Sequence, residues 1–159
     1  MTNLCGTCTA CCKVFAIADL DKPAGKWCGH CFVGQGCSIY QDRPTVCVEF
    51  KCLWLESQSR ADAHEHLPLA MRPDKSKCVI SPSTNPNVMS VITANGSPDA
   101  WRRTDIRRLL IGLVKHGMSV VIGPAASTRK TMLDMNGERV VTMTPPDKDG
   151  MQWSEEDQR

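Results

Sequence analysis

Cysteine is the residue type whose number and spacing in this chain point to chemistry. The 159 residues contain 10 cysteines, and nine of them fall between Cys5 and Cys52. Dense cysteine has three common explanations: a disulfide scaffold, a metal or cluster site, or scattered buried thiols. The first five residues show no secretory signal, so we expect a cytoplasmic location. Because that compartment is reducing, clustered thiols there are metal ligands more often than disulfides.

Cys5-x2-Cys8-x2-Cys11-Cys12 is the first of three cysteine groups. A Cys-x2-Cys pair lets two thiolates reach one metal ion across a tight turn. If this segment were helical, Cys5, Cys8 and Cys12 would share a face, with Cys11 about 100° away from Cys12. We therefore expect either that Cys11 and Cys12 serve different ions or that only one of them is a ligand.

Cys28-Gly-His30-Cys31-x5-Cys37 is the second group. Its glycines allow the backbone to fold sharply around a bound ion. His30 lies between two cysteines and is a further candidate ligand, because imidazole joins thiolates in many zinc sites.

Cys47-x4-Cys52 is the third group, and Asp42 with Pro44 predicts a helix start just before it. On one helix, five residues rotate the two thiols about 140° apart. Cys47 and Cys52 should then point to different sites, unless the helix breaks between them. Cys78 stands alone before an apolar run, and we expect it to be a small buried residue at a strand edge.

The rest of the chain has the pattern of an ordinary α+β fold. We expect strands over 88–92 and 118–122, a helix over 98–116 and a hairpin of 128–135 with 139–143. Ser97 and Pro98 predict the start of that helix, and His116-Gly117 predicts its end. Asn136-Gly137 is the hairpin signal.

The composition divides the chain into four stretches. We expect a cysteine-cluster metal-binding region (1–56), a connector (57–86), an α+β region (87–146) and a flexible acidic tail (147–159). The predicted fold class is α+β, with a cysteine-rich, metal-organised N-terminal half packed on a small antiparallel sheet with one main helix. Together these stretches should form one compact domain.

Charge and hydropathy argue against several partners and activities. Lys115 and His116 interrupt the longest apolar run, so no membrane association is expected. Basic residues on the predicted helix are typical of a solvated face, and an aromatic content of 5% is poor material for base stacking, so nucleic acid is not an expected partner. Ligated thiolates are not free nucleophiles, which argues against a thiol hydrolase.

The ligand count suggests more than one ion. A structural zinc takes four ligands, so nine clustered thiols and one imidazole fill two sites with two groups over, and bridging thiolates could hold three ions. Two zinc ions with four thiolates each would change the formal charge of the chain from +2 to about −2. Five nearby cations are available to offset that charge: Lys13, Lys22, Lys26, Arg43 and Lys51.

Residues 5 to about 55 resemble the bacterial YkgJ-like cysteine-cluster family. The resemblance is carried by Cys-x2-Cys-x2-Cys-Cys at 5–12, Lys-Pro-Ala-Gly-Lys-Trp-Cys-x-His at 22–30, and Gly-Cys-Ser-Ile-Tyr-x2-Arg-Pro-x2-Cys-x2-Phe-x-Cys at 36–52. That family is described as having a zinc- or iron-chelating CxxCxxCC domain. The resemblance implies ligand roles for eight cysteines: Cys5, Cys8, Cys11, Cys12, Cys28, Cys37, Cys47 and Cys52. Cys31 lies outside the family pattern and is a further candidate metal ligand, as is His30.

The family has no settled reaction, and four functions stay open for this chain. We expect first a protein with two or more zinc ions in a structural or regulatory role, in which metal binding and folding of residues 1–56 are coupled. The alternatives are an iron or iron–sulfur redox protein, a metal-transfer protein for soft ions, and a protein-interaction module with zinc as its scaffold. No Cys-x3-Cys-Pro completes a ferredoxin run here, and no glycine-rich cofactor loop supports the methylation associated with a longer relative. The sequence assigns no reaction.

Overall fold

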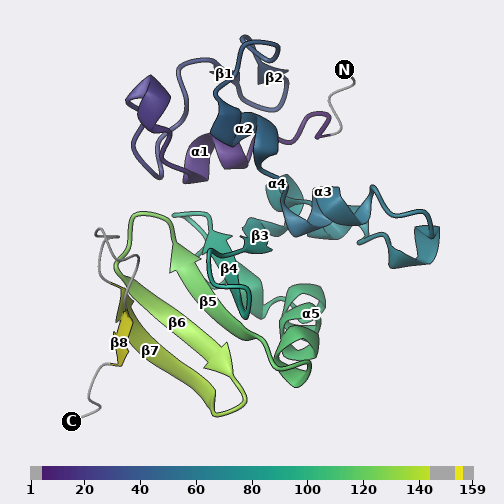
Figure 1. The fold of residues 1–159 in the computed structure, drawn as a ribbon, viewed down its shortest axis with the longest axis vertical. Helices are drawn as coiled ribbons and strands as arrows, with labels where there is room; N and C mark the ends of the chain where they lie inside the picture. Colours follow the sequence, from purple (N-terminus) through teal and green to yellow (C-terminus); the bar gives the residue numbers. More distant parts are fainter. Residues whose placement is uncertain (1–4, 144–152, 156–159) are drawn as a thin grey trace.

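The computed structural model of the protein describes residues 5–143 and 153–155, the last three by their backbone alone. Residues 5–52 form a cysteine-rich lobe at one end of a β-sheet, and the short helices α3 and α4 lie between the lobe and that sheet (Figure 1). The predicted α+β class is confirmed. No helix among the described residues is long and apolar enough to span a membrane.

The main sheet has six strands in the order β3-β4-β5-β6-β7-β8. The strands are β3 (Cys78–Pro82), β4 (Val88–Thr93), β5 (Ser119–Pro124), β6 (Arg129–Asp134), β7 (Gly137–Met143) and β8 (Trp153–Glu155). The sheet is mixed rather than purely antiparallel, because β4 and β5 are parallel, with Met89 opposite Val120. Helix α5 forms the crossover between these two strands, as a parallel connection requires.

Helix α5 (Thr104–Lys115) is the main helix, and it covers one face of the sheet (Figure 1). The predicted start at residue 98 is wrong. A separate 3-10 turn, η4 (Ala100–Arg102), comes first, and Arg103 then takes the non-helical angles φ −57° and ψ 140°. The predicted end is confirmed: Nδ1 of His116 lies 2.8 Å from the carbonyl oxygen of Gly112, and Gly117 has φ +84°.

The hydrophobic core lies between α5 and the sheet. Ile106, Leu110 and Val114 project from the buried face of the helix and belong to one cluster with residues of β3, β4 and β5. Leu110 is fully buried, and burial of a side chain of this size contributes roughly 1.5–3 kcal/mol. This core needs no cysteine from the lobe.

The predicted C-terminal hairpin is confirmed. Asp134 pairs with Gly137, so Met135 and Asn136 form the turn, one residue earlier than the Asn-Gly signal suggests. The backbone N–H of Asn136 donates to Oδ1 of Asp134 at 2.8 Å, which fixes this turn. Part of the predicted flexible tail is instead strand β8, which pairs with β7. The other residues of that tail, 147–152 and 156–159, lie outside the described residues.

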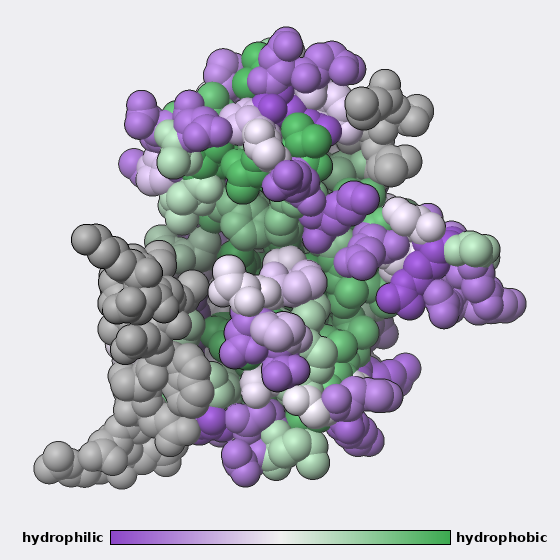
Figure 2. All heavy atoms as spheres, in the orientation of Figure 1, coloured by the Kyte–Doolittle hydropathy of each residue, from purple (hydrophilic) through white to green (hydrophobic). Residues whose placement is uncertain are grey.

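The remaining elements are short. They are α1 (Cys11–Val14), η1 (Ala18–Leu20), β1 (Cys31–Phe32), β2 (Gly36–Cys37), α2 (Thr45–Glu49), α3 (Leu53–Ser57), η2 (Ala63–Glu65), η3 (Leu69–Met71) and α4 (Pro73–Ser76). The stretch expected to be a connector, 57–86, thus contains two 3-10 turns, a helix and the edge strand β3. Hydrophilic residues dominate the segment that projects beyond α3 (Figure 2).

The lobe has little apolar core of its own. Val14, Ile17 and Cys28 are its buried hydrophobic residues among those described. The rings of Phe15 and Phe50 add one aromatic contact, with centroids 4.5 Å apart. Hydrophobic side chains also reach the surface of the lobe and its junction with the sheet (Figure 2).

Candidate metal centre

Backbone hydrogen bonds bring the separate cysteine motifs together. The N–H of Cys8 donates to the carbonyl oxygen of Cys5 at 3.0 Å, so the first Cys-x2-Cys is a turn rather than the helix considered above. The N–H of Cys28 donates to the carbonyl oxygen of Cys12, also at 3.0 Å. Strands β1 and β2 then place Cys31 directly opposite Cys37.

We define a first thiol group as Cys5, Cys8 and Cys52. Cys5 lies within electrostatic range of both other thiols, and Cys52 within range of Cys8. Burial, followed by the charges of Cys52 and Cys8, raises the pKa of Cys5 to about 11. Cys52, which lies 44 positions after Cys8, is thereby grouped with two cysteines near the N-terminus.

Backbone N–H groups point at two sulfurs of this first group. The sulfur of Cys8 accepts hydrogen bonds from the N–H groups of Ala10 and Asp74. Backbone N–H groups of Trp54 and Leu55, at the start of α3, act on the sulfur of Cys52 in the same way. Such bonds favour the thiolate form that ligates metal, although burial still leaves both pKa values raised.

Arg72 fastens the Cys5–Cys8 turn to the body of the protein. Its Nη2 donates to Oγ1 of Thr7 at 3.1 Å, and its Nε and Nη2 donate to the Asp74 carboxylate at 2.6 and 2.8 Å. The Arg72 guanidinium holds the pKa of Asp74 below its usual range. The first thiol group therefore lies where the lobe meets α4.

We define a second thiol group as Cys11, Cys12, Cys28, Cys31, Cys37 and Cys47. Its centre is Cys12, whose thiol is hydrogen-bonded to those of Cys11 and Cys31. The Cys11 contact and burial raise the pKa of Cys12, and burial followed by Cys12 raises that of Cys31 to about 11. Cys47 lies within electrostatic range of Cys12, Cys28 and Cys37.

The structure brings the adjacent Cys11 and Cys12 into the same group. Their thiols are in hydrogen-bonding contact although α1 separates the two Cα–Cβ directions. Cys31, which falls outside the family pattern, contacts both Cys12 and Thr9. Thr9 is buried, and its Oγ1 also accepts a hydrogen bond from Gly34 N–H at 3.1 Å. No spacing rule predicts this supporting role of Thr9.

Cys47 and Cys52 lie in different groups, as their spacing predicts, although the helix between them breaks. Helix α2 ends at Phe50, which has ψ 124°, and Cys52 has ψ 158° before α3 begins. The alternative in which the helix breaks is therefore the one observed. Pro44 precedes the first turn of α2 without a side-chain cap, so Asp42 does not have its predicted capping role.

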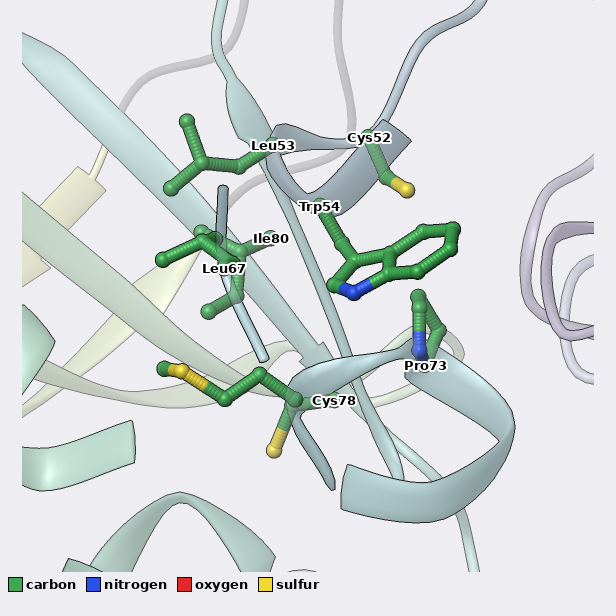
Figure 3. A pocket seen from close by; sticks show the side chains of 8 residues that line it. Cys52, Leu53, Trp54, Leu67, Pro73, Cys78 and Ile80 are labelled. Carbon is green, nitrogen blue, oxygen red and sulfur yellow. The ribbon is translucent and has the colours of Figure 1, made fainter. Parts of the chain in front are cut away.

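His30 and Cys78 lie apart from both groups. His30 is exposed and contributes its backbone carbonyl to a 2.8 Å hydrogen bond from Ser38 N–H. Cys78 begins β3 and is 1% exposed, as predicted for a small buried residue at a strand edge. Cys52 and Cys78 line the same small cavity of about 10 Å³, but the Cys78 sulfur points away from Cys52 and Trp54 (Figure 3).

The thiols of these residues have the chemistry that a soft metal ion needs, but their side chains are not arranged to enclose one. All ten cysteines, which lie within residues 5–143, are free thiols. Within that same range, no three Cys, His, Asp or Glu side chains lie close enough together to enclose an ion. Nε of Arg43 is buried with no hydrogen-bond partner in the described part of the chain, and Arg43 acts electrostatically on both Cys5 and Cys47. Backbone N–H groups thus act on thiols of the first group, and the Arg43 guanidinium acts on one thiol of each group.

Comparison with known protein families, curated proteins and solved structures finds no match to this chain.

Proposed function

We propose that this protein is a multinuclear metal-binding protein, with zinc as its metal and a structural or regulatory role for the ions. Its ligands are the thiolates of Cys5, Cys8, Cys11, Cys12, Cys28, Cys37, Cys47 and Cys52. Cys31 joins this set on account of its contact with Cys12. The proposal includes a reducing, cytoplasmic location, where free thiols persist.

One observation carries the proposal: nine thiols from three sequence motifs gather in a lobe that has little apolar core. Because metal binding is coupled to folding in small metal-binding regions, an ion that links these thiols would stabilise such a lobe. Zinc supplies that link by binding four thiolates tetrahedrally. The resemblance of residues 5–55 to a metal-chelating family agrees with this interpretation.

The raised thiol pKa values describe the metal-free state. At neutral pH the thiols of Cys5 and Cys31, whose pKa values are about 11, hold their protons. A metal ion ligates the thiolate, so each ligand must lose its proton on binding.

The two thiol groups support at least two ions. The first group has three thiols and the second has six. Cys5 of the first group lies within electrostatic range of Cys12 of the second, so the charges of the two groups influence each other. Three thiolates can hold one ion with a fourth ligand from elsewhere, while six can hold one or more through bridging sulfur.

Cobalt titration of the reduced, metal-free protein tests this function. Co²⁺ bound to thiolates gives intense near-ultraviolet charge-transfer bands and tetrahedral visible bands, which zinc itself lacks because its d shell is filled. We expect these bands to saturate at two or more Co²⁺ per chain and to disappear on adding zinc. A Cys78→Ala control should titrate like the wild type. Absence of thiolate bands, or bands that zinc does not displace, would overturn the proposal; a brown protein with bound iron would instead establish the iron or iron–sulfur alternative.

A further inference from the structure

Lys22 is a buried lysine at the base of the cysteine-rich lobe. It is 6% exposed, and its backbone pairs with Ile17 in an isolated β-bridge. Its ammonium group donates hydrogen bonds to the carbonyl oxygens of Lys13 and Pro23, both at 3.2 Å, and to that of Phe15. All three donors of the ammonium are therefore occupied, and the side chain is fixed in place.

A buried ammonium normally needs a negative partner. Carbonyl oxygens satisfy its hydrogen bonds, but they do not carry the full charge that offsets its removal from water. No carboxylate forms an ion pair with Lys22 within residues 5–143. The charge of Lys22 thus has no conventional counterion in the described part of the protein.

Thiols of the second group are the ionisable groups that act on Lys22. Burial lowers the pKa of Lys22, and four cysteines of this group act in the opposite direction. They are, in order of strength, Cys28, Cys12, Cys11 and Cys47. Its bond to the carbonyl of Lys13 fixes the Lys22 ammonium at the residue that follows Cys12.

The other four nearby cations are placed differently. Lys26 and Lys51 are exposed to solvent, where their charges are screened. Nζ of Lys13 lies 5.4 Å from the centre of the Trp27 ring, and the Arg43 guanidinium lies 3.7 Å from that of Tyr40. Among these five, Lys22 is the one whose whole residue is buried and whose charged group is held by three hydrogen bonds.

We propose that Lys22 is a fixed internal countercharge that stabilises the anionic, metal-bound form of the second thiol group. This inference rests on the proposed metal-binding function and deepens it. Lys22 is a positioning residue and not a ligand, because its ammonium donates all its hydrogen bonds to carbonyl oxygens. Its charge offsets part of the negative charge that a zinc ion acquires with three or four thiolates.

A purely structural role makes a different prediction. Lys13 and Phe15 lie at the C-terminal end of α1, where helix carbonyls lack partners, so Lys22 also acts as a cap. A neutral glutamine can donate to those carbonyls, whereas arginine can donate to them and keep the charge. The comparison of Lys22→Gln with Lys22→Arg therefore separates charge from capping.

Zinc affinity, measured by competition with a chromogenic chelator, is the first readout. We expect Lys22→Gln to weaken the tightest zinc site of the second group about 10- to 100-fold, the effect typical of groups that support metal ligands. Lys22→Arg and the exposed control Lys26→Gln should stay within about threefold of the wild type. Equal loss in the glutamine and arginine variants, equal affinity in all four proteins, or failure of both Lys22 variants to fold would overturn the proposal.

Thiol reactivity of the reduced, metal-free protein is the second readout. Because a nearby positive charge favours the thiolate, Lys22→Gln should slow alkylation of the second-group thiols by neutral iodoacetamide about threefold or more. A merely loosened lobe would expose those thiols and speed the reaction, which would contradict the proposal. This measurement needs no metal, so it separates the two failures: unchanged or faster alkylation refutes the role of Lys22 alone, whereas failure of wild-type protein to bind zinc refutes the proposed function and the role of Lys22 with it.

Discussion

The backbone N–H of Cys28 donates a 3.0 Å hydrogen bond to the carbonyl oxygen of Cys12, and this bond joins two cysteine motifs that are 16 positions apart. It places the Cys28–Cys37 hairpin region beside the end of the first motif. The thiol contact between Cys12 and Cys31 follows from that pairing. The backbone of the lobe therefore brings cysteines of separate motifs into one region.

Substitutions in the two thiol groups should have separable effects. We expect Cys5→Ser and Cys52→Ser to remove the ion of the first group and leave the second group loaded. Cys12→Ser should remove binding at the second group, because its thiol contacts both Cys11 and Cys31. Cobalt titration with visible and near-ultraviolet absorption measures the stoichiometry in each case. Identical loss of all ions in all three variants would contradict two separate groups, and Cys78→Ala is the matched control.

The sequence predicted the α+β class because the second half of the chain has clear local signals. The strand at 88–92, the hairpin around Asn136 and the helix end at His116 each depend on periodicity or turn chemistry within a few residues. Ser97-Pro98 has the pattern of a helix start and therefore predicts a helix from residue 98. Arg103 is non-helical, so α5 begins only at Thr104. The parallel pairing of β4 with β5 depends on a long-range crossover that no local pattern encodes.

Asp74→Asn should weaken the attachment of the lobe in a pH-dependent way. Arg72 lowers the pKa of Asp74, so this pair stabilises the folded state above the unfolded pKa near 3.8, and that stability is lost as pH falls through the folded pKa. We expect the variant to lose about 1 kcal/mol at pH 7 and little at pH 3, measured by urea unfolding. The exposed Asp99→Asn control should change stability by less than about 0.5 kcal/mol. A loss that is the same at both pH values would count against the ion pair.

Cys78 should make the protein sensitive to alkali. Burial raises its pKa from 9.0 to about 12, so the folded state retains a proton that the unfolded state loses above pH 9. Stability from this group is complete below pH 9 and declines as pH rises toward 12, by about 1.4 kcal/mol for each pH unit. Guanidinium unfolding of wild type and Cys78→Ala should therefore give free energies that converge between pH 9 and 10.5. Parallel pH curves would show that Cys78 does not titrate this way.

Two glycines near the core should respond oppositely to alanine. A Cβ on Gly112, in the middle of α5, would meet no atom within 4 Å, and Gly112→Ala should raise the free energy of unfolding by roughly 1 kcal/mol. Gly123 has φ +155°, and a Cβ there would lie 2.9 Å from Cδ of Lys130. Gly123→Ala should lower stability by about 1–3 kcal/mol. Thermal or urea unfolding measures both, and a stabilising Gly123→Ala would contradict the close packing of β5 against β6.

The candidate site was only partly predictable from the sequence. Cysteine spacing identified the thiols as candidate ligands, because a Cys-x2-Cys pair places two thiols on one tight turn. It predicted that Cys47 and Cys52 point to different sites, but it could not show that the helix between them breaks, that Cys31 acts on Cys12, or that Lys22 is buried. Each of those depends on which distant segments pack together, and the N–H donor from Asp74 to Cys8 spans 66 positions.

Elemental analysis of the protein, purified under reducing conditions without added metal, tests the central claim most directly. X-ray emission of metals relative to sulfur gives the number of ions per chain, since the chain contains 10 cysteines and 8 methionines as an internal standard. We predict two or more zinc ions for every 18 sulfur atoms. Fewer than one metal ion of any kind per chain, in protein whose thiols are shown to be reduced, would contradict a metal-organised lobe.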